Sequence, residues 1–278
     1  MALPPYMTTT EKVSHYGLRI FVGAVLLFLI APILAIMPLS FNSETFFSYP
    51  MPGFSTRWYF GETGFFTNER WTSALKLSVI VAIAATTLAT CLGTLAALGL
   101  SRSNIPGRAA IMAVLISPMI VPVIISAIGL FFFYAYPGLN GSLLGIILAH
   151  TALATPFVVI TVTATLMSFD RTLMRAGASL GGAPHTVFFK VVLPLILPGV
   201  ISGALFAFVT SFDEVIVILF IGGPEQRTLP RQMFSGIREL ISPTITAAAS
   251  VLIVFSTILL VTVELLRRRG ERLRGIKS

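Results

Sequence analysis

Long apolar segments constrain this chain more than any other feature of its sequence. Six of them occur, over residues 18–41, 77–100, 109–136, 143–169, 192–222 and 245–266. A helix rises about 1.5 Å per residue, so about twenty apolar residues cross the roughly 30 Å hydrocarbon layer of a bilayer. The strands of a membrane β-barrel would be shorter and would alternate apolar with polar residues. We therefore predict an all-α polytopic membrane protein with six transmembrane helices.

The composition supports a membrane location. Of the 278 residues, 55% are hydrophobic and only 11% are charged, which is too apolar for a single globular core of this size. The first segment, 18–41, is longer than the hydrophobic core of a signal peptide, which has about 7 to 15 residues. We predict that it is an uncleaved first span.

Several prolines lie within these segments or at their start. They are Pro118, Pro122, Pro156, Pro194 and Pro198. In a membrane protein, neighbouring helices can satisfy the backbone groups that a proline frees. We therefore expect these prolines to kink the spans rather than to end them.

Lysine and arginine are distributed unevenly between the segments that join the spans. Such residues are retained on the cytoplasmic side when they lie in short loops. With the N-terminus inside, the inner group is Lys12, Arg19, Arg102, Arg108, Arg171, Arg175, Lys190, Arg267, Arg268, Arg269, Arg272, Arg274 and Lys277, and the outer group is Arg57, Arg70, Lys76, Arg227, Arg231 and Arg238. This bias predicts that both termini are cytoplasmic, and it accounts for the net charge of +8 without a nucleic-acid partner.

The predicted orientation divides the chain into parts. They are a cytoplasmic N-terminus at 1–17, a first transmembrane helix at 18–41, an external loop at 42–73, a five-helix core at 74–266 with an inner loop at 168–193, and a basic cytoplasmic tail at 267–278. The external loop carries Trp58, Tyr59 and Trp71, and these aromatic residues favour a position at the membrane interface.

The inner loop 168–193 is too polar to lie in the membrane. Residues 173–180 are compatible with a helix, Gly181 and Gly182 break the pattern, and Pro184 is suited to open a second short helix. We predict a helix, a glycine turn and a second helix on the cytoplasmic face. Such an arrangement forms a compact lever that a soluble partner can push.

The sequence predicts no catalytic residues and no bound metal or cofactor. The three histidines, His15, His150 and His185, are far apart and lack the spacing of metal ligands. Cys91 is the single cysteine, so no disulfide can form within the chain. The sequence contains no GxxxxGK[ST] phosphate-binding loop. We therefore expect any ATP and magnesium to be bound by a separate protein.

The inner loop contains a spaced pattern of residues. Its members are Arg175, Ala176 and Gly177, then Gly181, then Val191, Val192, Leu193 and Pro194. This pattern resembles the coupling-loop signature of ABC importer permeases, which is a Glu-Ala-Ala triplet, a glycine four residues later, and an Ile/Val-x-Leu-Pro ending. Arg175 and Gly177 stand where the family has Glu and its second Ala. The resemblance implies a type I ABC importer permease fold and docking of this loop in a groove of a cytoplasmic ATPase.

Four downstream stretches narrow the resemblance. They are Ser211 to Val215, Gly222 to Pro224, Thr228 to Pro230 and Ser242 to Ala247. These stretches resemble the polyamine-type permeases, in particular the second permease of spermidine/putrescine importers. The resemblance implies these partners: a second, non-identical permease, two cytoplasmic P-loop ATPases, a periplasmic substrate-binding protein and membrane lipid. It also implies a bacterial inner membrane location and makes the external loop periplasmic.

Asp213 and Glu214 lie inside the fifth apolar segment, where a carboxylate costs at least about 2.5 kcal/mol. Fixed negative charge, together with the ring of Phe212, suits a pathway for cationic amines. Adjacent residues of a helix point about 100° apart, so we expect only one carboxylate to face the pathway. Alternatively, the pair joins helices or forms a gate.

Several functions remain open at this stage. Besides a polyamine permease, the sequence is compatible with an ABC importer permease for an opine or amino-acid-like solute. An ion-coupled secondary transporter would use Asp213 and Glu214 as protonation sites. A membrane scaffold would use the inner loop only for docking.

Overall fold

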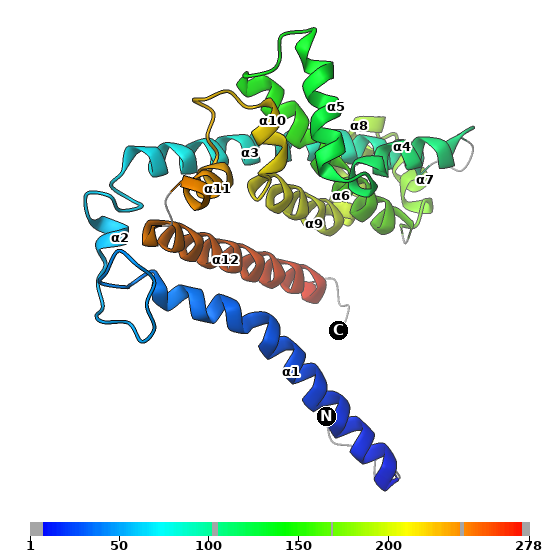
Figure 1. Cartoon of the computed structure of the whole chain (residues 1–278). Coiled ribbons are helices and arrows are strands. Elements are labelled where there is room, and N and C mark those ends of the chain that lie inside the picture. Colours follow the sequence, from blue (N-terminus) through cyan, green and yellow to red (C-terminus); the bar gives the residue numbers. More distant parts are fainter. Residues whose placement is uncertain (1–7, 102–104, 168, 240–241, 274–278) are drawn as a thin grey trace. The chain divides into compact units, whose positions relative to one another are not determined.

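The computed structural model of the chain describes residues 8–101, 105–167, 169–239 and 242–273 (Figure 1). Arg102, Ser168, Arg274 and Lys277, to which the sequence assigned positions on the inner side, lie outside these ranges. The chain divides into two compact units, one formed by Met1–Asn68 with Leu240–Ile253 and the other by Glu69–Glu239 with Val254–Ser278.

Helices make up nearly all the regular structure of the described residues, as predicted. In chain order they are α1 (Thr9–Leu39), α2 (Arg57–Phe60), α3 (Glu69–Leu100), α4 (Arg108–Ile120), α5 (Val123–Ala135), α6 (Leu143–Met167), α7 (Thr172–Ser179), α8 (Pro184–Val187), the π-helix η1 (Phe188–Val192), α9 (Leu193–Phe212), α10 (Ile216–Ile221), α11 (Leu229–Glu239) and α12 (Pro243–Leu273).

The helices confirm a polytopic protein. Within the described ranges, five are long and apolar enough to cross a membrane: Thr9–Leu39, Glu69–Leu100, Leu143–Met167, Pro184–Phe212 and Pro243–Thr262. A sixth span results if the bent pair α4 and α5 is counted as one. The six predicted spans therefore agree with the structure, but two of them are not continuous helices.

The third predicted span, 109–136, is broken rather than kinked. Its two halves, α4 and α5, meet at 105°. Val121, between them, is extended with ψ 132°, and Pro122 is the N-cap of α5. A residue before proline is disfavoured in the helical region, and proline has no amide hydrogen to continue the ladder. The expectation that Pro118 and Pro122 would only kink this span was therefore wrong at Pro122.

The fifth predicted span, 192–222, is also interrupted. The helix α9 ends at Phe212, and α10 begins at Ile216. Asp213 and Glu214 fall in the gap, so the expectation that they occupy adjacent positions of one helix was wrong. Pro194 and Pro198, in contrast, lie inside α9 without breaking it.

Three helices extend beyond the apolar segments from which the spans were predicted, while the predicted membrane boundaries stay predictions. The first helix begins at Thr9, before the predicted span at residue 18, because Thr8 and Glu11 form a reciprocal capping box. The helix α3 starts at Glu69, within the predicted external loop 42–73. The last helix continues to Leu273, so the basic segment that was predicted as a tail begins as helix.

The second unit contains a scaffold of three helices, α3, α6 and α9, which pack closely on one another. Glycines allow close approach at two of their contacts. A Cβ atom on Gly93 would lie 2.7 Å from Cβ of Val158, and one on Gly203 would lie 2.9 Å from Cα of Val158. Without a hydrophobic driving force in lipid, close backbone approach of this kind is what holds membrane helices together.

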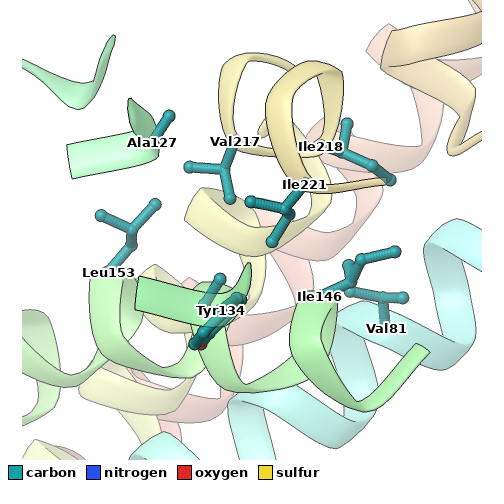
Figure 2. Close-up of a cluster of buried hydrophobic side chains, with 9 residues drawn as sticks. Val81, Ala127, Tyr134, Ile146, Leu153, Val217, Ile218 and Ile221 are labelled. Atoms are coloured by element: carbon teal, nitrogen blue, oxygen red, sulfur yellow. The ribbon is translucent and has the colours of Figure 1, made fainter. Parts of the chain in front are cut away.

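A separate hydrophobic cluster joins the two broken spans. Figure 2 shows Ala127 and Tyr134 of α5 together with Val217, Ile218 and Ile221 of α10, packed against residues of α6 and α3. The halves of the broken spans that follow each interruption, α5 and α10, thus contact each other and are supported by α6.

The first unit buries two aromatic residues of the loop, Trp58 and Tyr59. Trp58 and Tyr59 are 5% and 8% exposed and form a core with Ala247. The Trp58 indole donates a hydrogen bond to the Asn42 carbonyl at 2.7 Å. In the second unit, Trp71 is likewise 8% exposed. These three side chains therefore pack inside the protein instead of presenting their rings to lipid. The position of the loop at the membrane interface stays a prediction.

The scaffold contact gives a first prediction. We expect Gly203→Val to lower the thermal stability of the purified protein, because its Cβ atom would overlap Val158 and overpacking costs about 1–3 kcal/mol. Fluorescence-detected gel filtration after heating measures this. The matched control is Gly99→Val, at a helical glycine whose Cβ atom would meet nothing within 4 Å. Equal melting temperatures for the two variants would contradict the packing.

Candidate functional site

Two carboxylates, those of Asp213 and Glu214, lie in the interruption between α9 and α10, so neither residue is inside a helix. Asp213 is the C-cap of α9, and its amide donates to the Val209 carbonyl at 3.0 Å. Its side chain is exposed in the single chain. A carboxylate at this depth of an apolar span therefore remains available to another molecule.

Glu214 is engaged differently. Its Oε1 atom accepts a hydrogen bond from the amide of Val217 at 2.9 Å, in the first turn of α10, and the residue is half-buried. The carboxylate thus caps a short helix that lacks a capping side chain at its N-cap, Val215. The two acids therefore differ in their contacts, and the cause is the break in the helix and not the angle between neighbouring helical positions. That only one of them faces the pathway stays a prediction.

The electrostatics of this break favour a cation. The last turn of a helix carries partial negative charge on its free carbonyl groups, and α9 has no basic residue there to offset it. Asp213 adds a full negative charge at the same place. Interrupted helices that present carbonyl groups and carboxylates inside the membrane are suited to binding positively charged solutes.

Phe212 lies in a different environment from the two acids. Its side chain is 6% exposed and is stacked on Phe208 at 5.5 Å between ring centroids. Phe255 lies against the same ring at 5.4 Å. These contacts hold the end of α9 in an aromatic cluster. A contact between Phe212 and substrate stays a prediction.

One residue of this site was missed from the sequence as a functional candidate. His150 of α6 was considered only as a metal ligand, but the structure brings its imidazole against Ser211, two residues before Asp213. The sequence did contain a signal for His150. A polar side chain in the middle of an apolar span is costly, so its presence there indicates a specific contact or function. Among the described residues, no three His, Cys, Asp or Glu side chains gather as a metal site.

The inner loop has the predicted helix, turn and helix. The first helix, α7, ends at Ser179, Gly181 has a positive φ of 79°, and α8 begins at Pro184. A positive φ is easily adopted only by glycine, which explains the residue at this turn. The second helix continues through the π-helix η1 into α9, where Leu193 and Pro194 occupy the first turn.

The two short helices of the loop contact each other through glycines. A Cβ atom on Gly177 would lie 3.2 Å from Cγ2 of Val187, and one on Gly182 would lie 2.8 Å from the Gly177 carbonyl oxygen. Val187 is buried in this contact. Arg175 and Ala176 are exposed on α7, so they are free to meet a partner.

The loop is also tied to its neighbours. Arg171 donates a hydrogen bond to the carbonyl of Ser101, at the end of α3. Asp170 accepts from the amide of Thr172 at 2.9 Å, and hydrogen bonds from the Thr172 side chain and amide hold the pKa of Asp170 below its usual value. A cavity of about 520 Å³, lined in part by Leu98, Phe169 and Phe188, lies between the loop and the ends of α3 and α6.

Comparison with known proteins agrees with these features. The spermidine/putrescine transport system permease protein PotC of Haemophilus influenzae is 33% identical over 259 residues, which cover 93% of this chain and 99% of that protein. The putrescine transport system permease protein PotI of Escherichia coli is 35% identical over 234 residues, 81% of this chain and 82% of that protein.

A solved structure shares the fold. A bacterial ABC transporter involved in the import of the acidic polysaccharide alginate contains a chain that superposes with a TM-score of 0.72, covering 96% of this chain and 99% of that one at 15% identity. The sequence pattern of the family described as "Binding-protein-dependent transport system inner membrane component" matches residues 89–272, which is more than half of the chain. The chain therefore belongs to this family and is a multi-pass permease subunit of an ABC importer, whose ATPase is a separate protein.

Proposed function

We propose that this chain forms, with a second and non-identical permease, the translocation pathway for a small cationic solute, a polyamine such as putrescine or spermidine. Two cytoplasmic ATPases that bind ATP and Mg²⁺ drive transport, and a periplasmic binding protein delivers the solute. Family membership makes an ion-coupled carrier and a passive scaffold poor alternatives. The observation that carries the proposal is the pair Asp213 and Glu214 at an interrupted helix within the membrane.

The charge of this site supports a cationic solute. A polyamine that leaves water loses its hydration, and a carboxylate beside the negative end of a helix replaces part of it. The two polyamine permeases at 33% and 35% identity point the same way. The fold does not determine which solute is transported, because a transporter involved in the import of the acidic polysaccharide alginate has the same fold. An opine or amino-acid-like solute is the second candidate.

Contacts between loops support the proposed grouping of the loops on the two sides of the membrane, which an inverted orientation would share. Arg171, assigned to the cytoplasmic side, is hydrogen-bonded to Ser101 at the end of α3. On the side assigned to the periplasm, the Gly141 amide donates to the Ile221 carbonyl at 2.8 Å, and the Gln226 side chain donates to the Gly141 carbonyl at 2.5 Å. Loops that the basic residues place on one side of the membrane therefore meet in space.

The acidic pair gives a substrate prediction. We expect Asp213→Asn to reduce putrescine and spermidine uptake about tenfold or more, because the exposed charge in a poorly screened pathway is lost. Glu214→Gln should reduce uptake less, since glutamine keeps an oxygen that can accept from the Val217 amide. Uptake into proteoliposomes that contain the purified transporter measures both effects.

Complex abundance and basal ATP hydrolysis are the controls for this comparison. Parental uptake by both neutral variants in a normally assembled complex would remove the carboxylates from the pathway. A parent that transports neither amine would remove the polyamine assignment, while leaving the membership of the importer family unaffected.

The glycine turn of the inner loop gives a coupling prediction. Gly181→Val should lower substrate-stimulated ATP hydrolysis and uptake several-fold, because a branched residue at φ 79° is strained by about 1–3 kcal/mol and redirects the lever. The control is Gly138→Val, at an outer glycine with φ 68° and equally open space. That variant carries similar strain on the other side of the membrane. If the two variants lose coupling equally, the assignment of Gly181 to coupling is wrong.

Orientation is tested by thiol labelling in a Cys91→Ser background, which removes the single native thiol. Tyr136→Cys and Ser179→Cys place exposed thiols in the outer loop and in α7. We expect an impermeant maleimide added to intact spheroplasts to label only the first, because the basic residues retain α7 inside. Lysed membranes should label both. Labelling of Ser179→Cys in sealed spheroplasts would overturn the proposed topology.

A further inference from the structure

His150 makes a contact that joins two distant parts of the chain. It lies in α6, is 1% exposed, and belongs to the unbroken scaffold. Its Nδ1 atom lies 3.1 Å from the carbonyl oxygen of Ser211 and 2.9 Å from the Ser211 hydroxyl oxygen. Ser211 is in the last turn of α9, immediately before the interruption.

The Ser211 carbonyl needs a partner because of that interruption. In a continuous helix it would accept from the amide of Val215, but α9 ends at Phe212 and Val215 is the N-cap of α10. Within an apolar span no bulk water is at hand to replace the lost bond, and a free carbonyl is costly there. The His150 imidazole occupies the position of the missing donor.

The two contacts of Nδ1 place different demands on the imidazole ring. The Ser211 hydroxyl can donate to Nδ1 or accept from it, whereas the carbonyl oxygen can only accept, so a hydrogen bond to the carbonyl requires the tautomer with the proton on Nδ1. In that tautomer the Nε2 atom is an acceptor, and it is buried with no hydrogen-bond partner within the described part of the chain. A buried, unsatisfied nitrogen is unfavourable compared with an apolar side chain. The presence of histidine at this position is therefore explained by its Nδ1 atom.

We propose that His150 is a positioning residue, which holds the α9–α10 interruption by donating to the Ser211 carbonyl and so keeps Asp213 and Glu214 outside a continuous helix. Without this donor, the partner that regular helix geometry would give the carbonyl is the Val215 amide. Forming that bond would continue α9 through the gap and draw both acids into helical positions. The inference deepens the proposed pathway and rests on it for its role in transport.

Two amide variants test the role of the donor. His150→Asn places a side-chain NH2 group near the position of Nδ1. His150→Gln introduces a side chain of similar polarity whose NH2 group lies one bond further from the backbone. We expect His150→Asn to retain most of the maximal putrescine uptake, and His150→Gln to lower it about fivefold to tenfold, the change that one lost hydrogen bond produces. Equal uptake by the two variants overturns the proposal.

Ser211→Ala separates the two oxygen atoms that face Nδ1. It removes the hydroxyl and keeps the carbonyl, so we expect uptake within about twofold of the parent, as for the loss of a secondary contact. If Ser211→Ala is as defective as His150→Gln, the hydroxyl and not the carbonyl is the functional partner, and the proposal is wrong.

Hydrogen exchange provides a readout that does not depend on the solute. In the purified complex, peptides that cover residues 209–219 should exchange more slowly in His150→Gln than in the parent and in His150→Asn, because a continued helix protects the amides of the gap. Unchanged or faster exchange in His150→Gln overturns the proposal even if uptake falls. If the parent imports no polyamine, the proposed substrate fails while this exchange measurement still decides the role of His150.

Discussion

The structure depends on one constraint of the lipid interior, which is that every backbone amide and carbonyl must find its partner within the protein. The helices α3 and α6 meet it by remaining unbroken, and so does α9 as far as Phe212. The two interrupted spans meet it by other means. At Pro122 there is no amide hydrogen to satisfy, and at the second gap the Glu214 carboxylate accepts from α10 while His150 faces the Ser211 carbonyl.

The same requirement for paired backbone groups distinguishes the unbroken helices of the second unit from its interrupted spans. Glycines allow α3, α6 and α9 to approach closely, so these helices form a dense support. The helices α5 and α10, which follow the two breaks, pack on each other and on α6 through larger aliphatic side chains. The carboxylates proposed for the pathway, Asp213 and Glu214, thus lie where a helix is interrupted, and unbroken helices support this part of the unit.

The sequence predicted the features that depend on composition and local pattern. The apolar segments indicated the spans, and Gly181 with Pro184 indicated the two short helices of the inner loop. The sequence did not predict the interruptions of the third and fifth spans. Hydropathy averaged over about twenty residues does not respond to the backbone dihedral angles of one or two residues. Burial of Trp58 and the contact of His150 with Ser211 depend on residues remote in sequence, which no local pattern encodes.

The bond between Glu214 and the Val217 amide has a consequence for how a solute is held at the break. The Glu214 carboxylate keeps its full charge but has part of its acceptor capacity occupied, so of the two acids Asp213 has more acceptor positions left for the N–H groups of an ammonium. Under the proposed function, the two carboxylates together match the charge of a diamine but not that of a triamine. A triamine then needs further acceptors from the second permease, so the range of solutes is set jointly by two different gene products.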